Sequence, residues 1–186
     1  MRRGAAILLA IALSVAGCRT QTVIRGGVEV PVAIAVAADL EAARVDLDEL
    51  RPRKARDRLE NLVQEIPGGP RNLEVFFLLA ETYKELGQLE PAIASYRAVV
   101  GRRSRSSFVP LAHLRLGELY RATGRPELAR RALARAPFDR AEREIRVRLY
   151  LLLAELTEEA GQIREAVRWL AYARRDVVER AEVEEL

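Results

Sequence analysis

The feature that most constrains the fold of this chain is an internal repeat of 37 residues. Its clearest copy is residues 73–101, in which two apolar helical faces are separated by Gly87 and Pro91. Glycine suits the left-handed residue that ends many helices, and proline is tolerated in the first turn of the next helix, where an N–H has no partner to lose. The segment is therefore predicted to be an antiparallel helix pair joined by a tight turn.

The same residue types return after every 37 residues along the chain. Small side chains recur in both helices: Ala43, Ala80, Gly117 and Ala154 in the first helix of each pair, and Ala55, Ala92, Ala129 and Ala166 in the second. The turn glycine recurs as Gly124 and Gly161, and a bulky position recurs as Leu59, Tyr96, Leu133 and Leu170. Both helices and their turn repeat in register, which predicts about four helix pairs.

This pattern resembles the tetratricopeptide repeat (TPR) family, in which a small residue in each helix is surrounded by bulky ones. The resemblance covers roughly residues 34–175, and the family's usual period is about 34 residues. We interpret the extra length as part of the connections at 101–107 and 137–140. The resemblance implies an all-α fold, a right-handed α-solenoid of about four TPR-like helix pairs over residues 33–186. It also implies a binding scaffold.

The helix pairs are predicted at 39–50 with 53–66, 73–87 with 91–100, 110–121 with 127–136, and 144–160 with 163–176. The first pair is the least regular, and we expect it to cap the array and to end at the breaker Pro67-Gly68-Gly69-Pro70. After Asp176 the acidic tail either extends the last helix or folds back as a partial cap. Without such a cap the array has an apolar end, which would meet a partner.

Residues 1–17 have the features of an export signal. Arg2 and Arg3 provide a basic start, and residues 5–15 are an apolar run too short to span a bilayer. Residues 15–18, Val-Ala-Gly-Cys, resemble the lipobox of bacterial lipoproteins, in which the leader is cut before the cysteine and that cysteine is acylated. Cys18 is the only cysteine of the chain and is therefore predicted to carry the lipid. The alternative is an ordinary secretory signal.

The lipoprotein resemblance implies attachment to the outer membrane on its periplasmic side, since no aspartate follows Cys18. Residues 18–32 are interpreted as a lipid-anchored tether that lets the repeats work away from the membrane surface. Gly26-Gly27 lies between two short β-branched runs and would also suit a small hairpin. Two such strands alone would be only marginally stable.

The sequence contains no group of residues typical of an enzyme. It has one histidine, no glycine-rich phosphate loop and no metal-ligand spacing. The histidine, His113, stands where the other pairs have Phe76 and Tyr150, which favours a packed helical side chain. We therefore predict no catalytic residue, no metal and no cofactor. The formal net charge of +4 includes the two arginines of the leader, and this near balance argues against a nucleic-acid partner.

In TPR arrays the first helix of each pair lines a concave groove, and the 37-residue step gives two rows of residues there. The rows are Leu40, Phe77, Leu114 and Leu151, and Arg44, Glu81, Glu118 and Glu155. They resemble an apolar stripe beside carboxylates, which would suit an apolar partner segment that carries basic residues. The other interpretation is that the glutamates only pair with arginines such as Arg115 and Arg121 on a solvated face.

Arginine is concentrated between Arg97 and Arg148, where fourteen arginines stand against five acidic residues. The cluster Arg102, Arg103 and Arg105 would either contact anionic headgroups or an acidic partner, or serve as a solubilising loop. Taken together, the sequence predicts a non-enzymatic adaptor lipoprotein that assembles envelope proteins, for example in secretin, pilus, outer-membrane assembly or motility complexes. The alternatives are an accessory factor of a cell-wall or lipid-handling enzyme complex and, if the leader is not a signal, a cytoplasmic TPR regulator.

Overall fold

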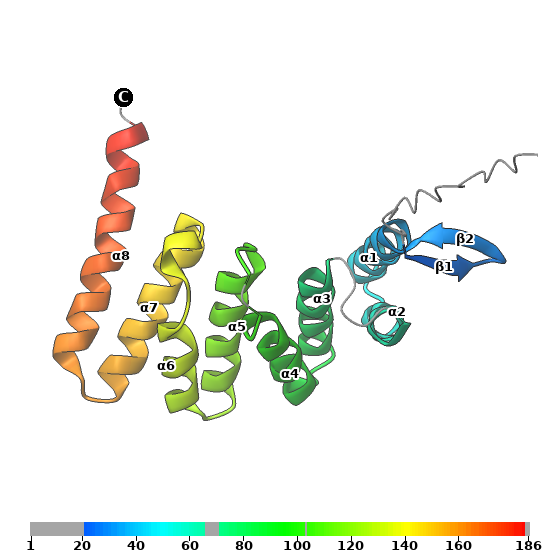
Figure 1. Ribbon diagram of the computed structural model, residues 1–186. Coiled ribbons are helices and arrows are strands. Elements are labelled where there is room, and N and C mark those ends of the chain that lie inside the picture. Colours follow the sequence, from blue (N-terminus) through cyan, green and yellow to red (C-terminus); the bar gives the residue numbers. More distant parts are fainter. Residues whose placement is uncertain (1–20, 66–70, 103, 185–186) are drawn as a thin grey trace, which may run out of the picture.

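The structure is a computed structural model that describes residues 21–65, 71–102 and 104–184. Over these residues, a hairpin and eight α-helices follow one another in a single curved row (Figure 1). The hairpin consists of β1 (Thr22–Arg25) and β2 (Val28–Pro31). The helices are α1 (Val32–Asp48), α2 (Pro52–Glu65), α3 (Asn72–Glu85), α4 (Leu89–Val100), α5 (Phe108–Ala122), α6 (Pro126–Ala134), α7 (Arg143–Glu159) and α8 (Ile163–Glu184), with a short 3₁₀ helix η1 (Phe138–Arg140) before α7.

Each helix packs mainly against its neighbours in sequence. The pairs are α1 with α2, α3 with α4, α5 with α6, and α7 with α8, and each second helix also contacts the first helix of the next pair. Units that contact only the units beside them are the mark of a solenoid. The predicted all-α solenoid of four helix pairs is confirmed.

The turn glycines close three of the pairs in the same way. Gly87, Gly124 and Gly161 have φ of 70°, 71° and 73°, in the left-handed region that favours glycine. The residue after each glycine donates its N–H to the carbonyl five residues earlier, as from Gln88 to Tyr83 at 2.8 Å. This pattern of bonds is a Schellman helix end. The predicted register is therefore confirmed at all three turns.

The recurring small residues lie where helices approach each other. Ala55, Ala92 and Ala129 are fully buried. At Gly117 the approach is too close for a side chain, since an added Cβ would lie 2.5 Å from Cδ2 of Leu133. Glycine in place of the alanine of the other pairs leaves room for that leucine.

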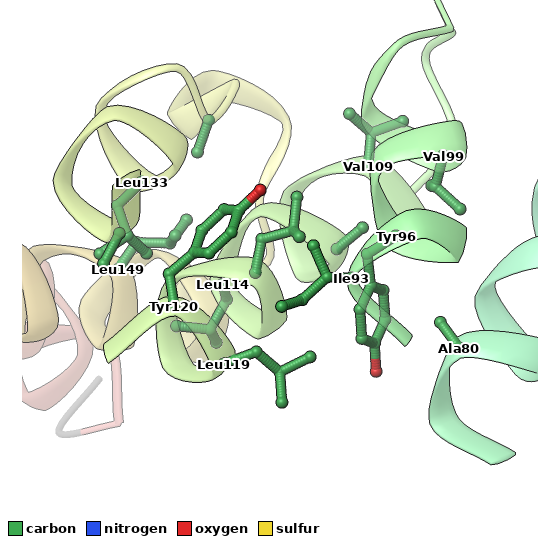
Figure 2. Packing of buried hydrophobic residues seen from close by; sticks show 14 of the residues in the cluster. Ala80, Ile93, Tyr96, Val99, Val109, Leu114, Leu119, Tyr120, Leu133 and Leu149 are labelled. Atoms are coloured by element: carbon green, nitrogen blue, oxygen red, sulfur yellow. The ribbon is translucent and has the colours of Figure 1, made fainter. Parts of the chain in front are cut away.

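The buried apolar side chains form two clusters that meet at α3. One cluster joins α1 and α2 to Val75 and Leu79 of α3. The other extends from Ala80 of α3 to Leu156 of α7, and Figure 2 shows how its side chains interdigitate between the helices. Tyr83 packs against both clusters.

Two helices are longer than predicted. α1 begins at Val32, seven residues before the predicted start at Asp39. α8 continues to Glu184, so the tail extends the last helix, which is one of the two predicted alternatives. The predicted breaker at 67–70 and the predicted leader at 1–17 with Cys18 lie outside the described residues.

Part of the predicted tether is folded. Residues 22–31 form the hairpin, with Val23 packed against the first cluster. Arg25 forms ion pairs with Asp39 at 2.8 Å and with Glu65 at 2.7 Å. The hairpin therefore does not depend on its own two strands alone, and residues 22–31 pack against the first helix pair.

Candidate partner-binding surfaces

The carboxylates of the predicted groove are paired with arginines of neighbouring helices. Glu81 of α3 accepts a hydrogen bond from Nε of Arg115 of α5 at 3.0 Å. Arg115 also donates to Glu118 at 2.9 Å, and Glu118 accepts from Arg148 of α7 at 2.7 Å. These four side chains form a continuous network across three first helices. The arginine-pairing interpretation of the glutamate row is therefore the one that these contacts support.

The remaining charged residues of the predicted site are paired in the same manner. Arg44 of α1 contacts Glu74 of α3, and Arg121 of α5 contacts Glu155 and Glu159 of α7. Exposed ion pairs of this kind contribute about 0–1 kcal/mol each. Their main effect is to fix one first helix beside the next, and they leave no row of unpaired negative charge for a basic partner.

Glu81 is the most enclosed member of this network. Burial alone raises the pKa of its carboxyl group, but hydrogen bonds from Lys84 and Tyr96 and the positive charges of Lys84 and Arg115 outweigh that effect. The net result is a pKa below the usual range for glutamate, so Glu81 is ionised at neutral pH. Its carboxylate is already bonded within the chain and is not free to bind a partner.

The apolar row of the predicted groove is mostly part of the core. Leu40 and Leu114 are fully buried, which corrects the prediction that they contact a partner. Phe77 is half-buried, with its ring centroid 5.7 Å from that of Tyr96, whereas Leu151 is 41% exposed. A residue four positions before the glutamate lies about 40° further round the helix. All four residues share this offset, and Leu40 and Leu114 are enclosed within the two apolar clusters.

A different surface carries arginines around two adjoining depressions. The larger has a volume of about 620 Å³ and lies between α4, α5 and α6, and the smaller, of about 430 Å³, lies over the connections that precede α5 and α7. Both share Val100, His113 and Arg135, so they form one continuous surface. We call it the arginine surface, and its arginines are Arg97, Arg102, Arg105, Arg131, Arg135 and Arg140.

The arginine surface differs in charge from the first-helix network. None of the described residues that line its two depressions is acidic. Of its six arginines, Arg140 alone has an ion pair with a described carboxylate, that of Asp139 at 3.6 Å. Apolar side chains, among them Leu116, Tyr120 and Leu128, line the larger depression. The surface thus combines positive charge with an apolar floor.

His113 forms part of that floor. Its Nδ1 lies 2.7 Å from the carbonyl oxygen of Ala132, to which it donates when protonated at that nitrogen. Burial lowers the pKa of His113, the bond to Ala132 opposes this, and the charge of Arg135 lowers the pKa further. A neutral, packed imidazole is therefore expected at physiological pH, in agreement with the sequence prediction for this residue.

The amino-acid sequence indicates the arginine surface only in part. The local excess of arginine and the cluster of Arg102 with Arg105 were visible, and Arg103 of that cluster lies outside the described residues. Arg131 and Arg135 carried no periodic signal, since the residues 37 positions earlier are Ala94 and Ala98. Arg131 lies in α6 and Arg135 caps its C-terminal end, and this spacing of four is the signal that could have identified them.

In the described part of the chain, no group of three or more histidine, cysteine, aspartate or glutamate side chains could hold a metal ion. Among the helices of residues 32–184 that the structure describes, none is long and apolar enough to cross a membrane.

Comparison with known proteins agrees with the fold. Residues 73–105 match the tetratricopeptide repeat family, so the class defined by fold and sequence is an α-solenoid of TPR-like helix pairs. No curated protein sequence matches the chain. The family match and the fold support a protein-interaction scaffold.

Several solved structures are similar in fold. A crystal structure of MamA shares 17% identity and a TM-score of 0.62, over 82% of this chain and 88% of that one. MamA from Desulfovibrio magneticus RS-1 shares 19% identity and a TM-score of 0.56, over 75% and 74% of the two chains. A kinesin light chain of TPR-like repeats from Podospora anserina shares 23% identity and a TM-score of 0.59, over 80% and 76%. At these identities the likeness concerns the fold alone.

Proposed function

We propose that this protein is a non-enzymatic, lipid-anchored scaffold of the bacterial envelope, and that it binds an acidic segment of a partner protein at the arginine surface. The observation that carries the proposal is the contrast between two sets of arginines. Arg115, Arg121 and Arg148 on the first helices are all paired with glutamates of the same chain. Five of the six arginines of the arginine surface have no such pair among the described residues.

The chemistry of the arginine surface indicates the chemistry of the partner. Guanidinium groups bind carboxylates through two parallel hydrogen bonds, and such charge-assisted bonds are stronger than neutral ones. An acidic segment would also relieve the mutual repulsion of Arg131 in α6 and Arg135 at the C-terminal cap of that helix, four residues further on. Tyr120 and the 39% exposed Leu128 would contact an apolar side chain of the same segment.

The shape of the arginine surface favours a protein segment over a membrane surface as its binding partner. Its larger depression, of about 620 Å³, has room for several side chains of an inserted segment. A planar layer of lipid headgroups would contact only its rim. Binding to an anionic membrane is therefore the competing outcome in the test below.

The test combines crosslinking with charge reversal. A photoreactive residue at Leu128 in cells would identify the bound protein, and a peptide copied from its acidic segment would then be titrated against the purified chain. Arg131→Glu with Arg135→Glu should weaken binding of that peptide about tenfold or more. The control is Arg164→Glu with Arg168→Glu, which has the same spacing on exposed positions of α8. Equal binding by both double variants, or binding of anionic vesicles without any peptide, would overturn this assignment.

The anchor and location are proposed from residues outside the described part of the chain. Cys18→Ala should abolish incorporation of a palmitate analogue and should release the protein from the membrane fraction or leave it unprocessed. Density-gradient separation of the wild-type membranes should place the protein with the outer membrane. Normal processing and unchanged fractionation of Cys18→Ala would contradict lipid anchoring without affecting the arginine surface.

A further inference from the structure

We propose that copies of this protein stack head to tail, with the open face of α8 in one copy against the open face of α1 in the next. This inference concerns the two ends of the helix row (Figure 1) and does not depend on the arginine surface or on lipid anchoring. It begins from the three junctions inside the molecule, where a second helix packs against the first helix of the following pair.

Each internal junction buries the same positions of the following first helix. In α3, α5 and α7 these positions lie 37 residues apart and are all buried: Val75, Leu79 and Thr82; Ala112, Leu116 and Leu119; Leu149, Leu153 and Leu156. Val75 and Leu79 belong to the cluster that α1 and α2 build, which shows that this face of α3 meets the preceding pair. The face is therefore the receiving side of a junction.

α1 carries the same face with no pair before it. The equivalent positions hold Ala38, Ala42 and Val45, all apolar, and Val45 is 43% exposed. Ile34, one turn before Ala38, is 60% exposed with the hairpin in place. The side chains at 34, 38, 42 and 45 lie on one side of the helix by their spacing. At the α1 end of the row, the receiving side is therefore not covered by any of the described residues.

α8 carries the other half of the junction. Leu59, Tyr96 and Leu133 are fully buried, whereas the fourth member of this set, Leu170, is 48% exposed. Val167 and Val177, which flank Leu170 on the same side of α8, are also exposed. The described part of α8 continues in one direction to Glu184 and does not fold back over this face.

The two open faces are complementary because they repeat a contact that the chain already makes three times. Contiguous exposed apolar faces often mark protein-interaction sites. One position beside each apolar face also makes the two faces complementary in charge. Inside the first junction, Val63 of α2 and Leu78 of α3 both pack against the shared cluster. At the open ends, the equivalent positions hold Arg174 and Glu41, which are exposed and opposite in charge.

A contact between unlike faces has a further property. It leaves one free head and one free tail after every addition, so it extends a row instead of closing a two-fold dimer. The alternatives are a two-fold dimer of like faces, or coverage of the α1 face by another part of the same chain, and each predicts a different crosslinking result.

The test uses two variants of the full chain in detergent, Glu41→Cys and Arg174→Cys, each with one introduced cysteine in addition to Cys18, and a short bismaleimide crosslinker. The mixture should give a crosslinked dimer, and each variant alone should give none beyond the level of the chain with only Cys18. A chain with both substitutions should give a ladder of larger products. Crosslinking of either variant with itself would indicate like faces and overturn the proposal, as would the absence of any product from the mixture.

A second measurement tests the interface without crosslinking. In sedimentation experiments, Leu170→Glu should raise the dissociation constant of self-association about tenfold or more. Leu151→Glu is the matched control, because Leu151 of α7 is similarly exposed but belongs to neither open face nor to the arginine surface. Glu41→Arg should also weaken association, and adding Arg174→Glu to it should restore much of the loss. Association of Leu170→Glu at the wild-type level would overturn the proposal.

Discussion

Glu81, Glu118 and Glu155 occupy the same position in three successive helix pairs, yet their surroundings differ. The side chain of Glu81 is 18% exposed and that of Glu155 is 55% exposed. Glu81 accepts a hydrogen bond from the hydroxyl group of Tyr96, whose pKa is raised by burial and by the nearby negative charge of Glu81. The same residue type in the same register is therefore part of a buried network in one pair and a surface group in another.

The lowered pKa of Glu81 makes a prediction about acid stability. A carboxyl group whose pKa is lower in the folded state stabilises the fold above its unfolded-state pKa, and this contribution is lost as the pH falls through the folded value. Glu81→Gln should therefore cost about 1–2 kcal/mol at pH 7 and progressively less below the ordinary glutamate pKa of 4.5. Urea unfolding between pH 7 and pH 3 would measure this, and Glu155→Gln is the comparison at an exposed position, where the loss at pH 7 should stay below about 1 kcal/mol.

Leu50 takes a backbone conformation that is unfavourable for leucine, and the 37-residue pattern does not reveal this. It stands 37 residues before Gly87 and takes the same left-handed conformation, with φ of 57°. Its neighbour Arg51 makes the same bond as Gln88 does, to the carbonyl of Asp46 at 2.7 Å. A non-glycine residue is disfavoured in this region by about 1–2 kcal/mol. The first pair therefore closes like the others, but against the preference of its turn residue.

Leu50→Gly should accordingly stabilise the protein by about 0.5–1 kcal/mol, because it removes this strain at an exposed position. The midpoint of urea unfolding would measure the gain. Glu49→Gly provides the comparison one residue earlier, where φ is −86° and any residue is tolerated. A gain from Glu49→Gly as large as that from Leu50→Gly would show that conformational strain is not the reason.

At the scale of elements, the hairpin and α1 depend on each other. Gly26 and Gly27 both have positive φ, 59° and 81°, which two-residue hairpin turns of the type that follows the strand twist require. The carbonyl of Gln21, the residue before β1, accepts a hydrogen bond from the N–H of Val32 at 2.8 Å, which ties the start of the hairpin to the start of α1. Arg25 then joins the hairpin to both helices of the first pair.

Arg25→Ala should loosen the hairpin more than it lowers the overall stability. Because Arg25 is partly exposed, the free energy of unfolding should fall by no more than about 1 kcal/mol. Hydrogen exchange of the amides at 22–31 should become clearly faster. Arg56→Ala should leave this exchange unchanged, since the ion pairs of Arg56 are with Asp57 and Glu60 of its own helix. Unchanged exchange in Arg25→Ala would mean that Val23 alone holds the hairpin.

The sequence predicted the elements that repeat and missed those that do not. The register of the pairs followed from small residues and turn glycines, because helix contacts and left-handed turns each admit few residue types. The start of α1 was missed because residues 32–38 are all apolar and show no polar face. Val32 and Val36 are buried against the first cluster, so no such face is needed on that side.

The candidate sites were predicted less well, for a different reason. Whether Leu40 and Leu114 face a partner or the core depends on how tightly successive pairs pack, and a periodic pattern does not record that distance. The pairing of Glu81 and Glu155 with arginines was one of two interpretations, since charge spacing alone does not distinguish a bound ion pair from a free row. The arginine surface required Arg97 of α4 and Arg135, which follows α6, to be brought together by the fold.

At the scale of the whole molecule, the two apolar clusters that meet at α3 each stabilise a different part of the helix row. Each repeat contacts only its neighbours, so a local loss of packing is felt first where it occurs. Leu59 is buried in the cluster of the first pair, and Leu133 is buried in the cluster of the later pairs. The two residues occupy the same repeat position and have the same side chain.

Leu59→Ala and Leu133→Ala should each cost about 2–5 kcal/mol, but at different places. Hydrogen exchange in Leu59→Ala should become faster mainly in α1 and α2. In Leu133→Ala it should become faster in α5, α6 and α7, with α1 and α2 little affected. The same exchange map for both variants would show that the array unfolds as one cooperative unit and that the two clusters are not separate in energy.

The three internal junctions also bear on how such a chain can change during evolution. Each one joins the same two faces, formed by the same positions 37 residues apart. Removing one whole period, such as residues 73–109, would bring together two faces of the kinds that already meet, and duplicating a period would do the same. A gene for this fold can therefore lengthen or shorten by unequal recombination within its own coding sequence, and each product would inherit a working interface.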